Sequence, residues 1–228
     1  MANFKRLRKM TAIEGNGNII SREVPVSSFI RLHVAARGNV RVVQSAEEKV
    51  TVETDENLQE YFYVQNSGRT LYVSCESVLR NPVFTRCEIT VSLRQIDTLD
   101  IRNYGNLACD GPLVLAGPLD IKVQSFGNTR LDIEAPSIKL LNQAVGDVSL
   151  KGRCESIQIK NQAQGNFTAK ELIARELTIK NMAEGNIELY AEKYIIIGHY
   201  GSGTVHYWGD AVMKDVKQYG SGPISHKG

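Results

Sequence analysis

The sequence IQIKNQAQGNFTA at residues 157–169 returns as LTIKNMAEGNIEL at residues 177–189, and five further versions of it lie between residues 99 and 226. In each version, alternating apolar residues lead to a polar break, to a Gly followed by Asn, Asp, Thr or Pro, and to a second alternating stretch. Strand-like alternation at a nearly constant separation is typical of a β-solenoid, in which each copy forms one coil. The anchoring glycines are separated by 22, 19, 19, 20, 18 and 19 residues, and they are Gly105, Gly127, Gly146, Gly165, Gly185, Gly203 and Gly222.

One copy has a single apolar face and cannot bury it alone. Ile157, Ile159, Phe167 and Ala169 lie at even offsets from Gly165, so they share one face of a pleated chain. Successive copies must therefore stack about 4.8 Å apart and share a core. We predict an all-β protein, a parallel β-helix of about 19–22 residues per coil with extra antiparallel strands in its N-terminal third.

The Gly-Asn pair is expected to form a corner of the coil. Gly adopts positive φ without strain, and Asn tolerates that conformation better than most residues. A second polar residue recurs four positions before the glycine, as Asn142, Asn161 and Asn181. Stacked at one corner, these asparagines would form a hydrogen-bonded ladder; the alternative is that they are ordinary turn residues. Asn103 lies two positions before its glycine, in a version that reads as shorter.

The N-terminal third departs from the regular period. Residues 1–13 are expected to be a basic tail or cap, and residues 14–228 a single domain, with 14–95 as an N-terminal β part and 96–228 as regular coils. YFYVQNSGRTLYVS at 61–74 predicts a hairpin that turns at Asn66-Ser67-Gly68. AKELIARELTI at 169–179 contains good helix formers, but its position between strands favours an extended edge of the coil.

Composition limits the classes of function. The chain has 228 residues, enough for one sizeable core, and its 42% hydrophobic and 23% charged content is ordinary for a globular protein. No apolar run approaches the length of a transmembrane segment. The net charge of +2 arises from four basic residues among the first ten. The rest of the chain therefore carries no excess of positive charge, and we expect no nucleic acid partner. The four cysteines and four histidines lack the spacing of metal ligands, so we predict no metal site and no cofactor.

The front of the chain, VSSFIRLHVAARGNVRVVQSAEEKVTVETDENL at 26–58, is followed by YGNL, FGNT, QGNF, EGNI and YGSGTV. In this order the motifs resemble the bacterial family of the putative auto-transporter adhesin, head GIN domain, over roughly residues 14–225. The resemblance implies a right-handed β-helix-like protein of the Bacteroidetes type, exported to the periplasm, outer membrane or cell surface, with no recognised catalytic residues. No apolar leader follows the basic start of the chain, so a cytoplasmic location stays an alternative unless a leader was removed.

The strands before each glycine supply the first candidate site. If they stack in register, one outward column reads Arg102, Lys122, Leu141, Lys160 and Lys180. An adjoining column reads Asp100, Asp120, Lys139, Gln158 and Thr178. A row of cations about 5 Å apart would follow an acidic polysaccharide or the phosphates of lipopolysaccharide. The alternative is a charged solvent face.

Aromatic residues in the last coils supply the second candidate site. His206 and Trp208 share outward parity, and Tyr200 and Tyr219 lie nearby in the sequence. An outward Trp beside His and Tyr would stack on the apolar face of a sugar ring. The same residues would equally serve as a cap on the open C-terminal end or as a subunit contact.

Polysaccharide lyases and hydrolases also use parallel β-helices, with two or three carboxylates or a calcium cluster on one face. Here only Asp100 and Asp120 are expected close together, so we predict no catalytic residue. The predicted function is a non-catalytic cell-surface or periplasmic adhesin-like binding module, with a polysaccharide or cell-surface glycan as its expected ligand. The alternatives are a polysaccharide-active lyase or hydrolase and a structural or scaffolding domain that binds another protein. Because open sheet edges invite association, we also expect homo-oligomers.

Overall fold

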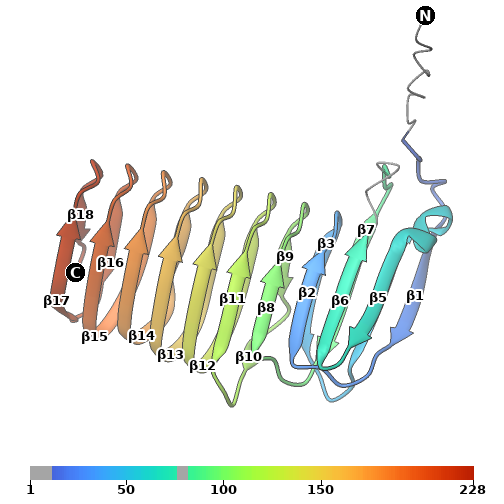
Figure 1. Cartoon of the computed structure of the whole chain (residues 1–228), viewed down its shortest axis with the longest axis horizontal. Helices are drawn as coiled ribbons and strands as arrows, with labels where there is room; N and C mark the ends of the chain where they lie inside the picture. The colour runs from blue at the N-terminus through green and yellow to red at the C-terminus, as the bar shows by residue number, and fades with distance from the viewer. Residues whose placement is uncertain (1–11, 76–81) are drawn as a thin grey trace, which may run out of the picture.

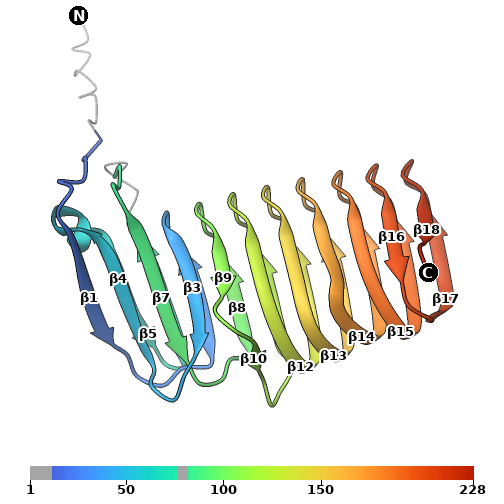
Figure 2. The ribbon, with the colours of Figure 1, turned by 180° about the vertical axis from the view of Figure 1, so that it is seen from behind.

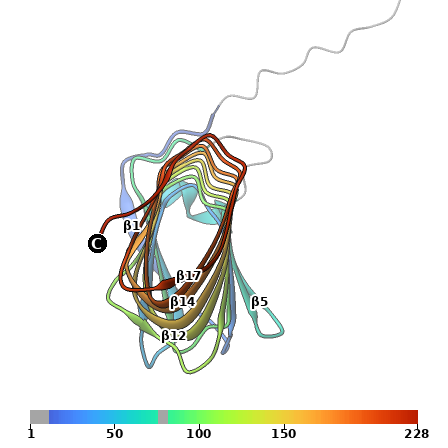
Figure 3. The ribbon, with the colours of Figure 1, turned by 90° about the vertical axis from the view of Figure 1, so that its left-hand side faces the viewer.

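The computed structural model describes residues 12–75 and 82–228, which form a β-solenoid. Successive coils lie side by side along the long axis of the molecule (Figures 1 and 2). Viewed along that axis, the coils superpose in a flattened oval with two long sides (Figure 3). The predicted basic tail at residues 1–13 lies almost entirely outside the described residues.

The two long sides are named here by their position relative to the glycine corners. On the pre-glycine side, neighbouring strands are β5 (Phe62–Ser67), β6 (Thr70–Cys75), β2 (Arg31–Ala35), β8 (Thr98–Ile101), β11 (Leu119–Val123), the second halves of β12–β15, and β17 (Val212–Gln218). On the post-glycine side they are β1 (Ile19–Pro25), β4 (Lys49–Asp55), β7 (Cys87–Leu93), β3 (Asn39–Gln44), β9 (Leu107–Cys109), the first halves of β12–β15, β16 (Val205–Trp208) and β18 (Ile224–His226).

Four central coils use one long bent strand for both sides. These strands are β12 (Thr129–Asn142), β13 (Val148–Asn161), β14 (Phe167–Asn181) and β15 (Ile187–His199), and they pair in parallel. The short β10 (Leu113–Val114) pairs with β12. The helix-forming stretch at 169–179 belongs to β14, as the flanking strands predicted, because pairing on both sides outweighs local propensity.

The coils do not stack entirely in sequence order. The coil of β2 and β3 comes first in the chain but lies between that of β6 and β7 and that of β8 and β9 (Figure 1). The predicted N-terminal antiparallel strands are present. The hairpin of β5 and β6 turns at Gly68, where φ is 55°, and β1 and β4 form a second antiparallel pair.

A short 3-10 helix, η1 (Glu56–Tyr61), lies at the N-terminal end of the solenoid. In the view along the axis it crosses the space between the two sides (Figure 3). Its Leu58 is fully buried, and Phe62, directly after it, is 4% exposed. Because a solenoid end otherwise leaves its core open to water, η1 acts as a cap on the first coil.

The core is a continuous column of inward side chains. Ile157, Ile159, Phe167 and Ala169 are buried, as their even offsets from Gly165 predicted. Their counterparts in neighbouring coils pair residue for residue, Ile157 with Leu177 and Ile159 with Ile179. Stacking therefore buries the apolar face that one coil cannot bury by itself.

The corner glycines are required for close approach rather than for positive φ, which corrects the sequence-based expectation. Positive φ occurs at Gly17, Gly68, Gly111, Gly152, Gly209 and Gly228, and none of these is an anchor glycine. A Cβ on Gly146 would instead collide with the carbonyl of Gly127, and a Cβ on Gly165 with the carbonyl of Gly146. Each anchor glycine thus lies directly against the backbone of the coil before it.

The predicted ladder of buried asparagines is present. Asn142 Nδ2 donates to Asn161 Oδ1 at 2.9 Å, and Asn161 Nδ2 donates to Asn181 Oδ1 at 3.0 Å. Asn181 Nδ2 then contacts Nδ1 of His199 at 3.0 Å. Asn103 lies outside this ladder, because Ile101 occupies the equivalent position in its coil and Asn103 Nδ2 donates to the Gly38 and Gly105 carbonyls.

His199 is held neutral at the end of this ladder. Asn181 Oδ1 accepts from Asn161, so Asn181 Nδ2 must donate, and Nδ1 of His199 must accept. A protonated ring would place two donors face to face. Burial likewise lowers the pKa of His199 below its ordinary value.

Gly146→Ala is expected to lower the free energy of unfolding by about 1–3 kcal/mol, because the new methyl group overpacks against the Gly127 carbonyl. The matched control is Gly117→Ala, where an added Cβ meets no atom and the backbone is in an ordinary conformation. Urea unfolding of both variants is the measurement. Equal stability of the two variants would contradict the close-contact role of the corner.

The unmodified protein is expected to lose stability as pH falls below about 6.5, because the unfolded chain takes up a proton on His199 that the fold excludes. The slope contributed by this residue reaches about 1.4 kcal/mol per pH unit between its unfolded and folded pKa values. His199→Asn extends the asparagine ladder and removes that contribution. Urea unfolding between pH 7 and 5 measures it, with His226→Asn at an exposed histidine as control. A slope that persists unchanged in His199→Asn would refute the assignment.

Candidate functional site

A hollow of about 420 Å³ lies on the pre-glycine side, across β8, β11 and the second halves of β12–β14. Its first column runs Lys122, Leu141, Lys160 and Lys180, paired in register across four coils. Its second column runs Thr98, Asp120, Lys139, Gln158 and Thr178. The name lysine hollow is used below for this surface.

The lysine hollow is positively charged and partly apolar. Its lining contains four lysines and one acidic residue, Asp120. Within residues 12–75 and 82–228, none of the four lysines forms an ion pair, although the Lys180 ammonium lies 5.4 Å from the Tyr200 ring centroid. The half-buried Leu141 and the lysine stems supply aliphatic surface between the charges.

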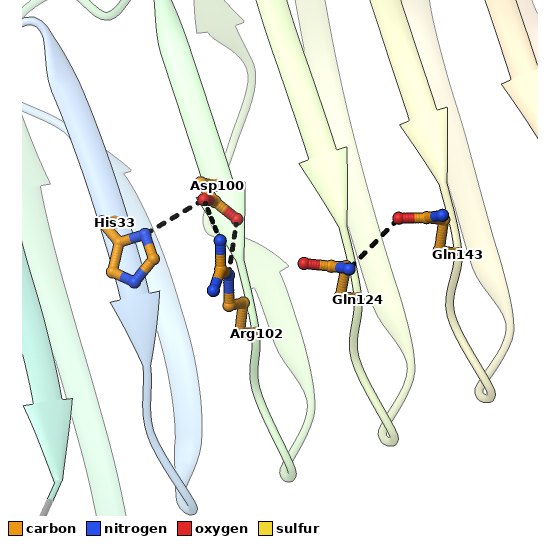
Figure 4. Close-up of polar contacts among 5 residues, drawn as sticks. All are labelled: His33, Asp100, Arg102, Gln124 and Gln143. Carbon is orange, nitrogen blue, oxygen red and sulfur yellow. Dashed lines mark hydrogen bonds and ion pairs between the residues drawn. The ribbon is translucent and has the colours of Figure 1, made fainter.

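Arg102 does not belong to the column that the sequence analysis gave it. Asp100 pairs with Lys122 and therefore starts that column, whereas Arg102 lies two residues further along the chain. Figure 4 shows the Arg102 side chain folded back onto Asp100, with its Nη2 atom 3.2 Å from Asp100 Oδ2. Counting from the glycine, Arg102 corresponds to Gln124 and Gln143, whose amides form an exposed hydrogen bond of 3.1 Å.

The two aspartates expected near each other differ in environment. Asp100 Oδ2 lies 3.1 Å from His33 Nδ1 and is also paired with Arg102 (Figure 4). Asp120 is exposed and aligns with Thr98 on one side and Lys139 on the other. The register therefore sets the two acids in different columns, and the described part of the chain contains no cluster of three His, Cys, Asp or Glu residues suited to a metal ion.

The aromatic residues of the last coils do not form one platform. His206 and Trp208 lie on the post-glycine side, with ring centroids 6.2 Å apart. Lys170 Nζ lies 5.8 Å from the centre of the Trp208 ring and covers it. Tyr200 and Tyr219 follow pre-glycine strands and stack on each other at 5.2 Å, so the solenoid core separates the two pairs.

Sequence reasoning missed an exposed apolar stripe at the corners. Tyr104, Phe126 and Val145 are 54%, 56% and 45% exposed, and the first two stack at 4.8 Å with nearly parallel rings. Arg37 lies 5.1 Å from the Tyr104 ring centroid. The signal was present in the sequence, because Tyr104, Phe126 and Val145 directly precede anchor glycines. Arg37 directly precedes Gly38, whose carbonyl lies against Gly105 in the same way.

The buried cysteines are poorly suited to act as nucleophiles. Cys75, Cys87, Cys109 and Cys154 form no disulfide within the described residues, and burial raises the pKa of Cys87 and of Cys154 to about 12. Such thiols are protonated and poorly nucleophilic at neutral pH.

Among the described residues, no helix has the length and apolar character needed to cross a lipid bilayer.

Comparison with known families identifies the class of this protein. The model of the family described as "Putative auto-transporter adhesin, head GIN domain" matches residues 28–211, and the chain belongs to this family, as its motifs indicated. No match is found among curated protein sequences.

Solved structures share the fold. A structure titled as a putative adhesin from Bacteroides fragilis superposes with a TM-score of 0.89 at 21% identity, covering 95% of this chain and 100% of that one. A putative lipid binding protein from Parabacteroides distasonis gives a TM-score of 0.68 at 22% identity, again with 95% and 100% coverage. A putative adhesin from the same organism gives 0.72 at 17% identity, with the same coverage. These likenesses show that the chain shares the β-solenoid fold of these structures.

Proposed function

We propose that this chain is an exported, non-catalytic binding module of the cell surface that holds an acidic polysaccharide along its lysine hollow. The observation that carries this proposal is the convergence of Lys122, Lys139, Lys160 and Lys180 on one hollow, with no ion-pair partner among the described residues. Several lysines elsewhere in the molecule are instead ion-paired, as Lys151 is with Asp132 at 3.0 Å.

The geometry favours an extended polymer over a small anion. Lys160 and Lys180 align on neighbouring strands about 4.8 Å apart, and Lys122 lies in the same column two coils before Lys160, so the row runs parallel to the solenoid axis. Carboxylates or sulfates carried on successive sugar units would each meet an ammonium group. Leu141 and the lysine stems would contact the apolar faces of the sugar rings between the charges.

A binding role is favoured over catalysis by the acids near the hollow. Glycoside hydrolysis needs two carboxylates in defined geometry, and Asp120 is the one acid among the residues that line the hollow. Asp100 is engaged by His33 and Arg102. The adhesin names of the family and of two structural relatives support the same reading.

Dextran sulfate and polygalacturonate are expected to bind the protein, with affinity that falls as salt concentration rises. Lys160→Ala/Lys180→Ala is expected to weaken binding about 10-fold to 100-fold, since each lost charge-assisted contact contributes on the order of 1 kcal/mol. Lys151→Ala/Lys193→Ala removes the same charge outside the hollow and is expected to bind nearly as well as the unmodified protein. Isothermal titration calorimetry at two salt concentrations is the measurement.

Equal weakening in the two double variants would mean that general positive charge attracts the polymer, which overturns the assignment to the lysine hollow. Vesicles of anionic phospholipid form a separate arm, because one structural relative is titled a lipid binding protein. Binding to these vesicles without binding to either polysaccharide would replace the glycan with a lipid headgroup and reject the proposal as stated.

A further inference from the structure

A second hollow, of about 510 Å³, lies on the post-glycine side beside the corners. Its rim is formed by the residue after each corner glycine, in the order Asn128, Asp147, Asn166, Asn186 and Thr204. Its floor contains Ser149 and Thr168, which pair in register on β13 and β14. The name amide trough is used below for this surface.

The rim side chains are held in one orientation by the next coil. Asn128 Oδ1 accepts the backbone N–H of Asp147 at 3.0 Å, and Asp147 Oδ1 accepts that of Asn166 at 2.8 Å. Asn166 Oδ1 accepts the N–H of Asn186 at 2.9 Å, and Asn186 Oδ1 accepts that of Thr204 at 3.2 Å. Because an amide nitrogen cannot accept a hydrogen bond, these contacts fix which end of each amide faces the backbone.

This arrangement leaves a row of polar groups unused. Across residues 12–75 and 82–228, no partner is found for the Nδ2 groups of Asn128, Asn166 and Asn186, or for the second carboxylate oxygen of Asp147. The floor hydroxyls of Ser149 and Thr168 also lack a protein partner in these ranges. The trough therefore presents oriented donors and acceptors on successive coils, about 4.8 Å apart.

The balance of charge differs from that of the lysine hollow. Arg130 and Asp147 offset each other in the amide trough, and Glu188 is already paired with Lys170 at 3.3 Å. Val148, whose side chain is buried, is the one aliphatic residue among those that line the trough. An anionic polymer or an apolar ligand thus gains little here, whereas a neutral ligand rich in hydroxyl groups can satisfy donors and acceptors together.

We propose that the amide trough is a second binding site, and that it takes a neutral glycan laid along the solenoid axis. Sugar hydroxyls both donate and accept, which suits alternating amide, carboxylate and hydroxyl groups. His206 closes the C-terminal end of the trough beside Trp208. This site is independent of the lysine hollow, since the solenoid core separates the two sides.

Two kinds of variant test the site without disturbing the fold. Ser149→Ala/Thr168→Val removes floor hydroxyls that have no partner in the described residues. Asn186→Asp keeps the oxygen that accepts the Thr204 N–H and replaces only the free NH2 group, and Asp147 already shows that an aspartate fits this ladder. The matched control is Thr178→Val, a threonine in the lysine hollow on the opposite side.

The probes are unsubstituted dextran, a mannan and a galactan, with dextran sulfate as the anionic comparator. At least one neutral polymer is expected to bind the unmodified protein, and both trough variants are expected to weaken that binding at least about 10-fold, the equivalent of about 1.4 kcal/mol. Dextran sulfate binding is expected to be unchanged in them, and Thr178→Val to bind the neutral polymer normally. Thermal unfolding of each variant checks that the fold is retained.

The proposal is overturned if none of the three neutral polymers binds at millimolar sugar concentration. It is also overturned if the trough variants bind the neutral polymer as well as the unmodified protein does. Loss of neutral binding in Lys160→Ala/Lys180→Ala but not in the trough variants would assign that ligand to the lysine hollow instead. Failure of dextran sulfate binding alone would reject the proposed function and leave the amide trough intact.

Discussion

The contact between the backbones of successive corner glycines sets the position of every other side chain in the solenoid. At each corner, the glycine of one coil lies so close to the carbonyl of the glycine before it that no Cβ fits between them. This contact, together with parallel strand pairing, aligns the residues of each coil that lie near the corner with those of the next coil, and the register shifts only further along, as between Ser149 and Lys151. A residue's distance from its glycine therefore decides which column it joins.

Several ladders follow from that alignment. Four residues before the glycine, buried asparagines hydrogen-bond along the axis and end at His199. Directly after the glycine, exposed side-chain oxygens accept backbone N–H groups of the next coil. Buried polar groups are costly unless satisfied, so the inner ladder holds the register, while the outer one orients free amide groups toward solvent. The same repeat that stabilises the fold thus builds two surfaces of different charge, one on each side, and these are the two surfaces that we propose as binding sites.

Much of the fold was predictable because the signals are local and repeated. The Gly-Asn spacing indicated the coils, and the parity of Ile157 and Ile159 indicated the core. The stacking order of the N-terminal coils was not predictable, since the insertion of the coil of β2 and β3 between two later coils depends on pairing between strands far apart in sequence. When the strands of different repeats have similar sequence patterns, the sequence does not indicate which strand each of them pairs with.

The candidate sites were predictable in part. Lys122, Lys160 and Lys180 do share a column, but Arg102 was placed in it because the strands were not counted from their glycines. The alternation of residues along the strand predicted that Trp208 points outward. It did not predict which side of the oval Trp208 occupies, because that depends on where the chain turns its corners. The asparagines after the glycines were read as turn residues, because their contacts lie in the next coil.

The most direct test of this account is an NMR titration of the reductively dimethylated protein, in which every lysine keeps its charge and gains a resolved methyl signal. With dextran sulfate added, the signals of Lys122, Lys139, Lys160 and Lys180 are expected to shift together and saturate, while those of Lys151 and Lys193 stay in place. Shifts spread evenly over all lysines, or no shift in the four, would contradict the claim that coil register builds a specific polyanion site.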